Sequence, residues 1–467
     1  NLEPSSILHE NFFVRTYRQG VAQHRYFNVE TLQRGLYHDK RRYAAVVLSE
    51  DGDTLQVEGV VGPNLKIRPI EMNERSENGR QAHLLETIED SDSDNVHGVF
   101  PEGQLSVLER ADKKRTGFDA SAYNIEMVFP EIFFIMDSRL RAGFNSTAAA
   151  MKYLMVALTV VNLRYRTVSN PKVQLILRGV EFSEHSQEVK YYNFLGNGGI
   201  DGLKSLYGIV EFVKKKNDTY GSFDMVYFST GYDMYAVEGS TYQQALSGFA
   251  FVASACIDTR EQLGEDTAYS YRMIRIAAHE VAHTLGCPHD GTSIEGHIKV
   301  FRPDATNCPW EQGHIMSYLE ENGNSMKFSS CCNYQMSLLS WTYEAECLRR
   351  NDSVTTIEKQ WLRKFKLPGE VLSKNRQCRM TYPDLVQTYY MPRLGIQNCI
   401  AQCFVPGYQF GGANGNWPMI LIDGSTCRNT PRMLCINGDC VLDRRTQRPK
   451  NLENSSDKLS ATTEKAL

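Results

Sequence analysis

Three histidines in the stretch HEVAHTLGCPHD have the spacing that one metal ion requires. The apolar pattern predicts a helix over 271–285, in which residues four apart lie one turn apart on the same face. His279 and His283 can therefore reach a single cation. Gly286 ends the helix in a conformation that a side chain would resist, which brings His289 toward the same point. The pattern predicts a zinc site at these three histidines.

The predicted zinc site is of the catalytic type. Three imidazoles leave the fourth tetrahedral position for water, whereas structural zinc is enclosed by four protein ligands. Glu280 follows the first ligand but points elsewhere on the helix, so it is free to act as a general base. HExxH alone occurs by chance in unrelated helices, and the glycine, the third histidine and Asp290 add the specificity. We expect Asp290 to anchor the loop beneath the metal by hydrogen bonds.

Composition and charge argue against two classes of partner. The chain has 467 residues, enough for two or three domains, and a net charge of -4, which argues against nucleic acid. The longest apolar candidate for a membrane span, 153–163, is interrupted by Asn162 and is too short to cross a bilayer. We therefore expect no membrane span.

The cysteines indicate the compartment. All 12 lie between Cys256 and Cys440, six around the zinc motif and six nearer the C-terminus, which indicates two separately crosslinked units. Paired CxxC blocks, which a structural metal site would show, do not occur in the sequence. Disulfides on this scale predict a secreted, extracellular protein. Asn-x-Ser/Thr acceptors agree and predict a glycoprotein, at Asn145, Asn217, Asn351 and Asn454.

The first 115 residues differ from the rest of the chain. Residues 1–115 contain no cysteine and are predicted to be a β-rich propeptide, with strands at 43–48, 55–61 and 65–70. They end in the basic cluster ADKKR, whose last residue, Arg115, is a candidate processing site. An ordinary charged surface loop is the alternative reading. Cleavage there would make the chain a zymogen, with 116–122 as the activation linker.

The central part of the chain has an α/β pattern. Strands are predicted at 131–136, 173–180, 224–229 and 249–253, and helices at 148–165, 203–215 and 271–285. We expect a catalytic domain over 123–350, a linker over 351–369 and a small disulfide-rich, cysteine-rich domain over 370–442. Residues 443–467 have the composition of a disordered tail.

Further motifs carry a family resemblance. HIMSY places Met316 downstream of the third histidine, where metzincin metalloproteases have a methionine turn beneath the zinc. The chain resembles this clan, and Asp290 directly after His289 matches its adamalysin (reprolysin, M12B) branch. Tyr318 resembles an astacin tyrosine that can join the metal, and we interpret it as a wall residue. LRYR, GEDT, CPWEQGHIMSY and the doublet Cys331-Cys332 resemble the salivary reprolysins of ticks.

The resemblance implies a fold and an activity. The fold would be an α/β (α+β) metzincin domain with a mixed twisted sheet and an active-site helix. The activity would be that of a zinc metalloendopeptidase, with Zn²⁺ as cofactor and extracellular matrix or clotting proteins, such as fibrin(ogen) and gelatin, as substrates in a salivary setting. We expect the substrate to lie extended along an edge strand near 248–255, because main-chain pairing accommodates any sequence.

The resemblance also bears on crosslinks and calcium. It favours a disulfide between Cys256 and Cys347. The pairing of the other four cysteines near the zinc motif stays open. Adamalysins often bind calcium, and Glu131 and Asp224 resemble two of the ligands. Arg350 stands where an asparagine is expected, so Ca²⁺ binding is left open.

Two alternatives concern regulation and function. Many metzincin propeptides silence the zinc with a cysteine thiolate, which a segment without cysteine cannot supply. His38 and Asp39 are a candidate replacement, and a plain surface pair is the alternative.

The rival function is an adhesion or anti-haemostatic protein whose cysteine-rich tail contacts matrix or platelet receptors. Because Glu280 is retained beside intact ligands, the sequence favours the enzyme.

Overall fold

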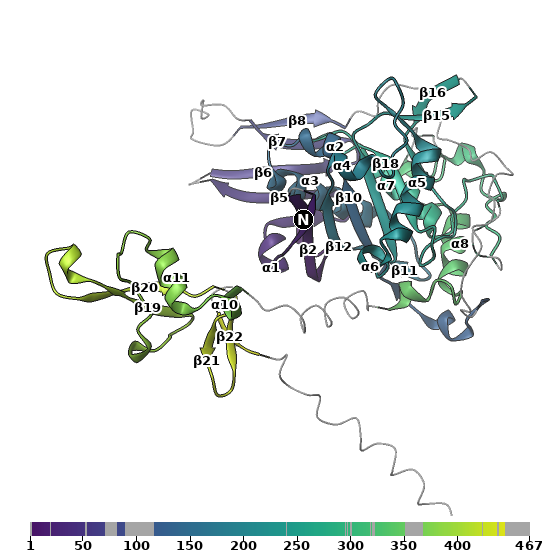
Figure 1. The fold of residues 1–467 in the computed structure, drawn as a ribbon. Helices are drawn as coiled ribbons and strands as arrows, with labels where there is room; N and C mark the ends of the chain where they lie inside the picture. Colours follow the sequence, from purple (N-terminus) through teal and green to yellow (C-terminus); the bar gives the residue numbers. More distant parts are fainter. Residues whose placement is uncertain are drawn as a thin grey trace, which may run out of the picture. The chain divides into compact units, whose positions relative to one another are not determined.

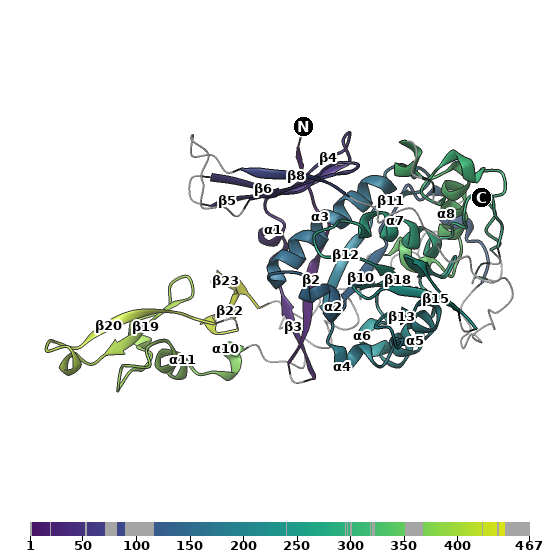
Figure 2. The same ribbon diagram turned by 90° about the horizontal axis from the view of Figure 1, so that it is seen from above.

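The chain forms two compact units, residues 1–354 and 355–467, and each is described by itself (Figures 1 and 2). The computed structural model describes residues 2–18, 20–51, 54–70, 82–88, 116–239, 241–294, 296, 298, 301–317, 319, 323–350, 368–422, 424–436 and 439–443. Within these ranges we find no candidate membrane-crossing helix, since none combines sufficient length with sufficient apolar character.

A seven-stranded sheet forms the centre of the first unit (Figure 1). The inner strands run parallel, and the two edge strands pair antiparallel. In spatial order the strands are β17 (Gly248–Ala250), β18 (Glu261–Glu265), β14 (Met225–Thr230), β10 (Glu131–Met136), β12 (Ile176–Phe182), β2 (Leu8–Arg18) and β3 (Val21–Tyr26). The predicted mixed α/β architecture is confirmed.

Helices cover both faces of this sheet. The helices described in the first unit are α1 (Val29–Leu32), α2 (Ser138–Ala142), α3 (Thr147–Tyr165), α4 (His185–Glu188), α5 (Gly202–Lys215), α6 (Asn217–Tyr220), α7 (Met273–Thr284) and α8 (Ser330–Ser340). Ile132 and Phe134 of β10 share a core with α3 and α7, whereas Phe133 and Ile135 share one with α5. Because side chains alternate along a strand, β10 serves both cores and is buried throughout.

Two predicted strands are displaced. β12 begins at Ile176 rather than 173, because β11 (Lys172–Val173) is a separate strand paired with β9 (Met127–Val128). β17 ends at Ala250 rather than 253. Its chain then turns, and the Ala253 amide donates to the His283 carbonyl at 2.9 Å. This turn joins the edge strand to the end of α7.

The first 88 residues take part in the first unit at two places. β2 and β3 belong to the central sheet, which the sequence did not predict. A second, antiparallel sheet packs on α3 through β5 and β6 (Figure 2). Its strands, in spatial order, are β1 (Glu3–Pro4), β4 (Leu36–Asp39), β5 (Ala44–Asp51), β6 (Thr54–Gly62), β7 (Leu65–Pro69) and β8 (His83–Thr87).

Short elements complete the first unit. A small sheet combines β13 (Ile200–Asp201), β15 (Met234–Glu238) and β16 (Thr241–Leu246). Single 3₁₀ turns are η1 (Ala120–Asn124), η2 (Trp310–Gln312), η3 (Gly323–Met326) and η4 (Glu346–Arg349).

The second unit has a small core made largely of half-cystines. It contains α10 (Pro368–Val371), α11 (Lys374–Thr381), η5 (Pro392–Leu394), β19 (Ile400–Val405), η6 (Gly407–Gln409), β20 (Gly415–Ile420), β21 (Thr426–Arg428), β22 (Met433–Ile436) and β23 (Asp439–Leu442). Its disulfides are Cys378–Cys403, Cys399–Cys435 and Cys427–Cys440. Few apolar side chains join them in the core, so the crosslinks supply much of the stability.

Candidate metal centre

Helix α7 carries two of the three histidines on one face. It ends near the predicted position, and Gly286 beyond it has a φ of 108°, the left-handed region that favours glycine. A Cβ there would also lie 3.1 Å from the Phe301 ring and 3.2 Å from the Gln335 carbonyl oxygen. The Gly286 amide donates to the His283 carbonyl at 2.8 Å, which turns the chain back toward the helix.

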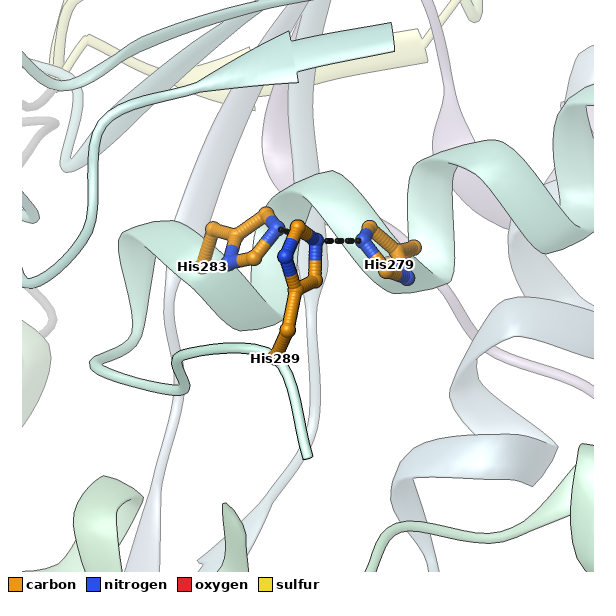
Figure 3. A group of neighbouring side chains, drawn as sticks. All are labelled: His279, His283 and His289. Atoms are coloured by element: carbon orange, nitrogen blue, oxygen red, sulfur yellow. Dashed lines mark hydrogen bonds between the residues drawn. The ribbon is translucent and has the colours of Figure 1, made fainter. Parts of the chain in front are cut away.

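The three imidazoles converge on one point (Figure 3). The Nε2 atom of His289 lies 3.1 Å from Nε2 of His279 and 3.1 Å from Nε2 of His283. Tetrahedral zinc bonded to imidazole at about 2.0–2.1 Å separates its nitrogen ligands by about 3.3 Å. The arrangement therefore fits one zinc ion bound by three Nε2 atoms.

The other ring nitrogens show which tautomer the ligands adopt. His279 Nδ1 lies 2.8 Å from the Ile315 carbonyl oxygen, and His283 Nδ1 lies 2.7 Å from that of Cys287. A carbonyl oxygen only accepts, so each Nδ1 must carry the hydrogen. Each Nε2 then carries the lone pair that a metal requires, and an Nδ1–H bonded to a carbonyl is the usual outer hydrogen bond of a histidine ligand. Burial lowers the pKa of His283 to about 4, which also favours the neutral ligand form.

Asp290 and Met316 lie beneath the histidines. Met316 is fully buried, and its carbonyl accepts from the Asp290 amide at 3.1 Å. The Asp290 carboxylate is also buried and accepts from the Ser329 hydroxyl at 2.6 Å. That hydroxyl accepts in turn from the Cys332 amide and caps α8. Asp290 thus ties the third-ligand loop to α8 and to the turn that holds His279.

Glu280 is enclosed between α7 and the edge strand. Its side chain is 2% exposed, and burial raises the pKa of its carboxyl group well above the usual value. A bound cation at the histidines would act in the opposite direction. A Cβ built on Gly248 of β17 would lie 2.4 Å from Glu280 Oε1. The carboxylate therefore lies directly against the strand at the open edge of the sheet.

Comparison with known proteins identifies the family. The profile of the Metallo-peptidase family M12 matches residues 131–329, which include all three histidines. These residues form a reprolysin-type metalloprotease domain. Its activity is that of a metalloendopeptidase, and the three histidines are positioned for the zinc that this family uses.

Similar proteins include venom enzymes. "Venom metalloproteinase antarease TserMP_A" of Tityus serrulatus is 27% identical over 338 residues, covering 69% of this chain and 81% of its own. A Bombyx mori protein, "A disintegrin and metalloproteinase with thrombospondin motifs like", is 27% identical over 273 residues, covering 54% and 37%. The solved structure of metalloproteinase-II from Bacteroides fragilis is 9% identical over 72% of this chain and 85% of its own. Its TM-score of 0.31 is too low to carry an argument.

Three disulfides brace the metalloprotease domain. Cys256–Cys347, the pair that the resemblance favours, is present and joins the segment after β17 to η4. The pairs that the sequence left open are Cys287–Cys332 and Cys308–Cys331. Cys287 lies directly after Gly286, and its disulfide ties the end of the zinc motif to α8. Cys287 is therefore a crosslink and its carbonyl, not its sulfur, supports the ligand His283.

The other residues predicted from the sequence are the calcium candidates, the glycosylation candidates, the processing site and Tyr318. Asp224 Oδ2 accepts from the Glu131 amide at 2.9 Å, and His9 Nε2 lies 3.8 Å from Glu131 Oε1. The Asp224 carboxylate thus lies against the Glu131 backbone, and calcium there stays a prediction. The guanidinium of Arg350 donates to Glu346. Asn145 and Asn217 are exposed, as glycosylation requires, whereas Arg115, Tyr318, Asn351 and Asn454 lie outside the described residues.

Sequence reasoning missed several residues that shape the site. The carbonyls of Ile315 and Cys287 leave no trace in the sequence, because every residue has one. Gly248 begins the edge segment 248–255 that the sequence predicted, but its contact with Glu280 was not predicted. Ser329 had a usable signal, since a serine ahead of an apolar helix is a common N-cap.

Proposed function

We propose that the chain is a secreted zinc endopeptidase that cleaves extracellular matrix or clotting proteins. One observation carries the zinc assignment: two Nδ1–H groups donate to backbone carbonyls, which turns Nε2 lone pairs toward one point. Six disulfides and the venom metalloproteinases among the similar proteins support secretion.

In this proposal Glu280 is the general base. Zinc, when bound, would supply a Lewis acid that acidifies water and polarises a peptide carbonyl. The Glu280 carboxylate would take a proton from the attacking water and return it to the leaving amine as the peptide bond breaks. Its burial supports this role, because burial raises the pKa of the carboxyl group and so makes its carboxylate a stronger base.

We assign substrate binding to β17. In the sheet formed by the described strands, β17 is the last strand and pairs with β18, so its outer side is the place where an extended peptide would pair. Gly248 on β17 touches Glu280, so a peptide on this edge would lie beside the base. Main-chain pairing would align many sequences, and side-chain pockets would set the preference.

The test uses the full chain with fibrinogen and with gelatin. Cleavage is expected for the wild type, is lost with a zinc chelator and returns with added zinc. Glu280→Gln is expected to bind zinc and to leave both proteins intact. Cleavage that survives both the chelator and the substitution would remove Glu280 and zinc from the mechanism.

We further propose the organisation expected from the sequence. Residues 1–115 would be a propeptide processed at Arg115, 123–350 the catalytic domain, and 370–442 a cysteine-rich domain that follows it. Calcium at Glu131 and Asp224, and glycans at Asn145 and Asn217, belong to the same proposal. N-terminal sequencing and mass spectrometry of the secreted protein test the processing and the glycans directly.

A second candidate function, partner binding by the cysteine-rich domain, has one observation in its favour. Trp417 forms ring contacts with Tyr382 and Phe410, and Phe410 is 60% exposed. Ile420 on the same strand as Trp417 is 70% exposed. Exposed aromatic groups of this kind are enriched at protein interfaces. Phe410→Ser with Ile420→Ser should weaken adhesion to fibrinogen while peptide cleavage is retained, and unchanged adhesion would reject this function.

A further inference from the structure

The N-terminal segment, residues 2–88, contributes an internal strand to the catalytic sheet. β2 pairs with β12 in parallel on one side and with β3 on the other. Its register places Val14 opposite Val180 and Arg15 opposite Glu181. Without β2, the N–H and C=O groups along β12 would form an unpaired parallel edge. The sheet of the catalytic domain is therefore completed by the segment that precedes it.

Apolar side chains of β2 are built into the catalytic core. Leu8, Phe12 and Val14 are buried in the same cluster as the side chains of α3 and α7. On the opposite face, the ring of Phe13 lies 5.7 Å from that of Phe133. A Cβ on Gly179 would lie 2.8 Å from the Phe133 ring and 3.1 Å from the Phe13 ring, so the glycine on β12 leaves room for both rings. The fit is that of a domain interior.

A buried charge of the catalytic domain is compensated from the N-terminal segment. Glu181 on β12 is 1% exposed, and the Arg15 guanidinium Nε lies 3.3 Å from its Oε2 atom. The hydroxyls of Tyr17 and Tyr220 each donate to this carboxylate at 2.9 Å. Loss of the N-terminal segment would remove Arg15 and Tyr17 and leave Glu181 without its ion pair, which is costly for a buried carboxylate.

A second contact area lies on α3 and ahead of α7. Leu36, Val47 and Val60 of the six-stranded sheet are buried in the same core cluster as α3. Lys66 Nζ donates to the Tyr269 carbonyl at 3.2 Å, shortly before α7. The N-terminal segment is thus attached at two places, by a shared sheet and by a sheet packed on a helix.

The described part of the N-terminal segment lies away from the metal centre. In the central sheet, β12, β10, β14 and β18 separate β2 from the substrate-side edge strand β17. His38, the candidate inhibitory ligand, contacts the Ser5 hydroxyl at 2.6 Å. Among the described residues, the group of side chains that could bind the metal ion is His279, His283 and His289, all of which follow the N-terminal segment in the sequence.

We infer that the N-terminal segment is a lasting subunit of the protease, which stays bound through β2 after the chain is cut before the catalytic domain. Its role is to complete the sheet and to neutralise Glu181, and the metal centre works with the segment in place. The proposed processing at Arg115 gives the natural occasion for the cut, but the inference does not need that particular site.

The experiment cuts the full chain at an engineered site. A recognition sequence for a specific protease replaces residues within 105–115, in a Glu280→Gln background so that the chain cannot digest itself. After complete cleavage, the two fragments are expected to co-elute on native size exclusion and to separate only in denaturant. Separate elution under native conditions overturns the inference, whether or not the catalytic fragment stays folded. Because this readout needs no peptidase activity, it is independent of the proposed function.

Arg15→Gln and Arg18→Gln form a matched pair on the same strand. Arg15 is buried against Glu181, whereas Arg18 is exposed at the end of β2. In the cut protein, Arg15→Gln should speed dissociation of the fragments by about thirtyfold or more, as expected when one partner of a buried charge pair is truncated. Arg18→Gln should leave the rate unchanged. Equal rates for the two variants would contradict the role of the ion pair.

The catalytically intact chain provides the last readout. With Glu280 restored, the cut complex is expected to cleave a zinc-protease peptide substrate while the N-terminal fragment still co-elutes. Activity that arises only in fractions from which the fragment has dissociated would show that the segment is an inhibitor to be released, and would overturn the inference.

Discussion

Gly248 and Glu280 approach so closely that a single added carbon on the glycine would lie 2.4 Å from the carboxylate oxygen Oε1 and 2.8 Å from Cδ. The glycine belongs to the edge strand β17 and the glutamate to the zinc-motif helix α7. This contact joins the surface that would bind substrate to the group that would move its proton. It makes the position of the base depend on a strand whose sequence carries no catalytic side chain.

Gly248→Ala should therefore impair catalysis more than stability. The obstructing atoms are the end of a flexible side chain, so the carboxylate can swing away while the backbone stays in place. A displacement of about 1 Å at a reacting group can cost about 100-fold in rate. We expect kcat/KM for a peptide substrate to fall by about that factor, with zinc content and thermal midpoint near wild type. Gly196→Ala is the control, since a Cβ there meets nothing within 4 Å. Activity within twofold of wild type would show that the contact is unimportant.

Glu280→Gln tests the base itself. The amide keeps the shape of the side chain but cannot accept the proton, so kcat should fall by about 10²–10⁴-fold. Zinc should remain at one per chain by atomic absorption, because the three imidazoles are untouched. The metal-free form should be no less stable, since burial already disfavours the charged carboxylate. Glu211→Gln, at an exposed position on α5, is the control. A Glu280→Gln protein without zinc would mean that the residue acts through the ligands.

Ser329→Ala should weaken the support beneath the third ligand. The substitution removes the hydroxyl that caps α8 and donates to the buried Asp290 carboxylate. Loss of such a bond costs about 1–3 kcal/mol, and we expect the free energy of unfolding to fall by this amount. Zinc release to a chelator should also become faster, because the loop carrying His289 is less firmly held.

Ser146→Ala separates the two effects of that substitution. Ser146 caps α3 through the Ala149 amide at 3.0 Å, and its hydroxyl lies in an exposed setting. Removing this cap should cost about 1 kcal/mol and leave zinc release unchanged. If the two serine variants release zinc at the same rate, Asp290 does not transmit stability to the ligand.

The metal centre was more predictable from the sequence than its surroundings. Two ligands sit four residues apart on one helix, and the third follows a glycine turn, so short-range geometry alone brings His279, His283 and His289 together. The Nδ1 acceptors could not be predicted, because the carbonyl of Ile315 reaches His279 only through tertiary folding over 36 residues. The contact of Gly248 with Glu280 depends on how the edge strand crosses α7.

Helices and strands could be predicted where the apolar pattern of the neighbouring residues marks them. β10 and α5 appear within a residue or so of the predicted ranges, since an unbroken apolar run and an amphipathic repeat mark them. β2 was missed as a strand of the catalytic sheet. Its partner β12 lies more than 150 residues away, and pairing over such a separation has no local pattern. From the sequence alone an arginine in a strand is expected to be exposed, and the burial of Arg15 is explained only by its partner Glu181.

The buried carboxyl group of Glu261 on β18 should make the stability of the protein depend on pH. It is fully buried, and in the described part of the chain neither carboxylate oxygen has a hydrogen-bond partner. Burial raises the pKa of Glu261 from 4.5 to about 8, and the nearby Arg260 opposes this only in part. The unfolded chain therefore loses this proton at a lower pH than the folded chain does. The contribution to stability is fully present below pH 4.5 and is lost as pH rises toward 8.

Glu261→Gln should remove that pH dependence, because the amide has the same shape and no charge. Relative to wild type, the variant should gain stability between the two pKa values, at a slope of at most about 1.4 kcal/mol per pH unit. Urea unfolding with the disulfides intact, at pH 5, 6, 7 and 8, measures the difference. Asp137, Glu265 and Asp266 also have pKa values raised by burial, each to about 7, so the wild-type curve alone cannot isolate Glu261. The difference between Glu261→Gln and wild type isolates it, because the other groups are the same in both proteins. The exposed control Glu211→Gln should follow wild type at every pH. A constant offset between Glu261→Gln and wild type would mean that the carboxyl group finds a charge-stabilising environment in the folded protein.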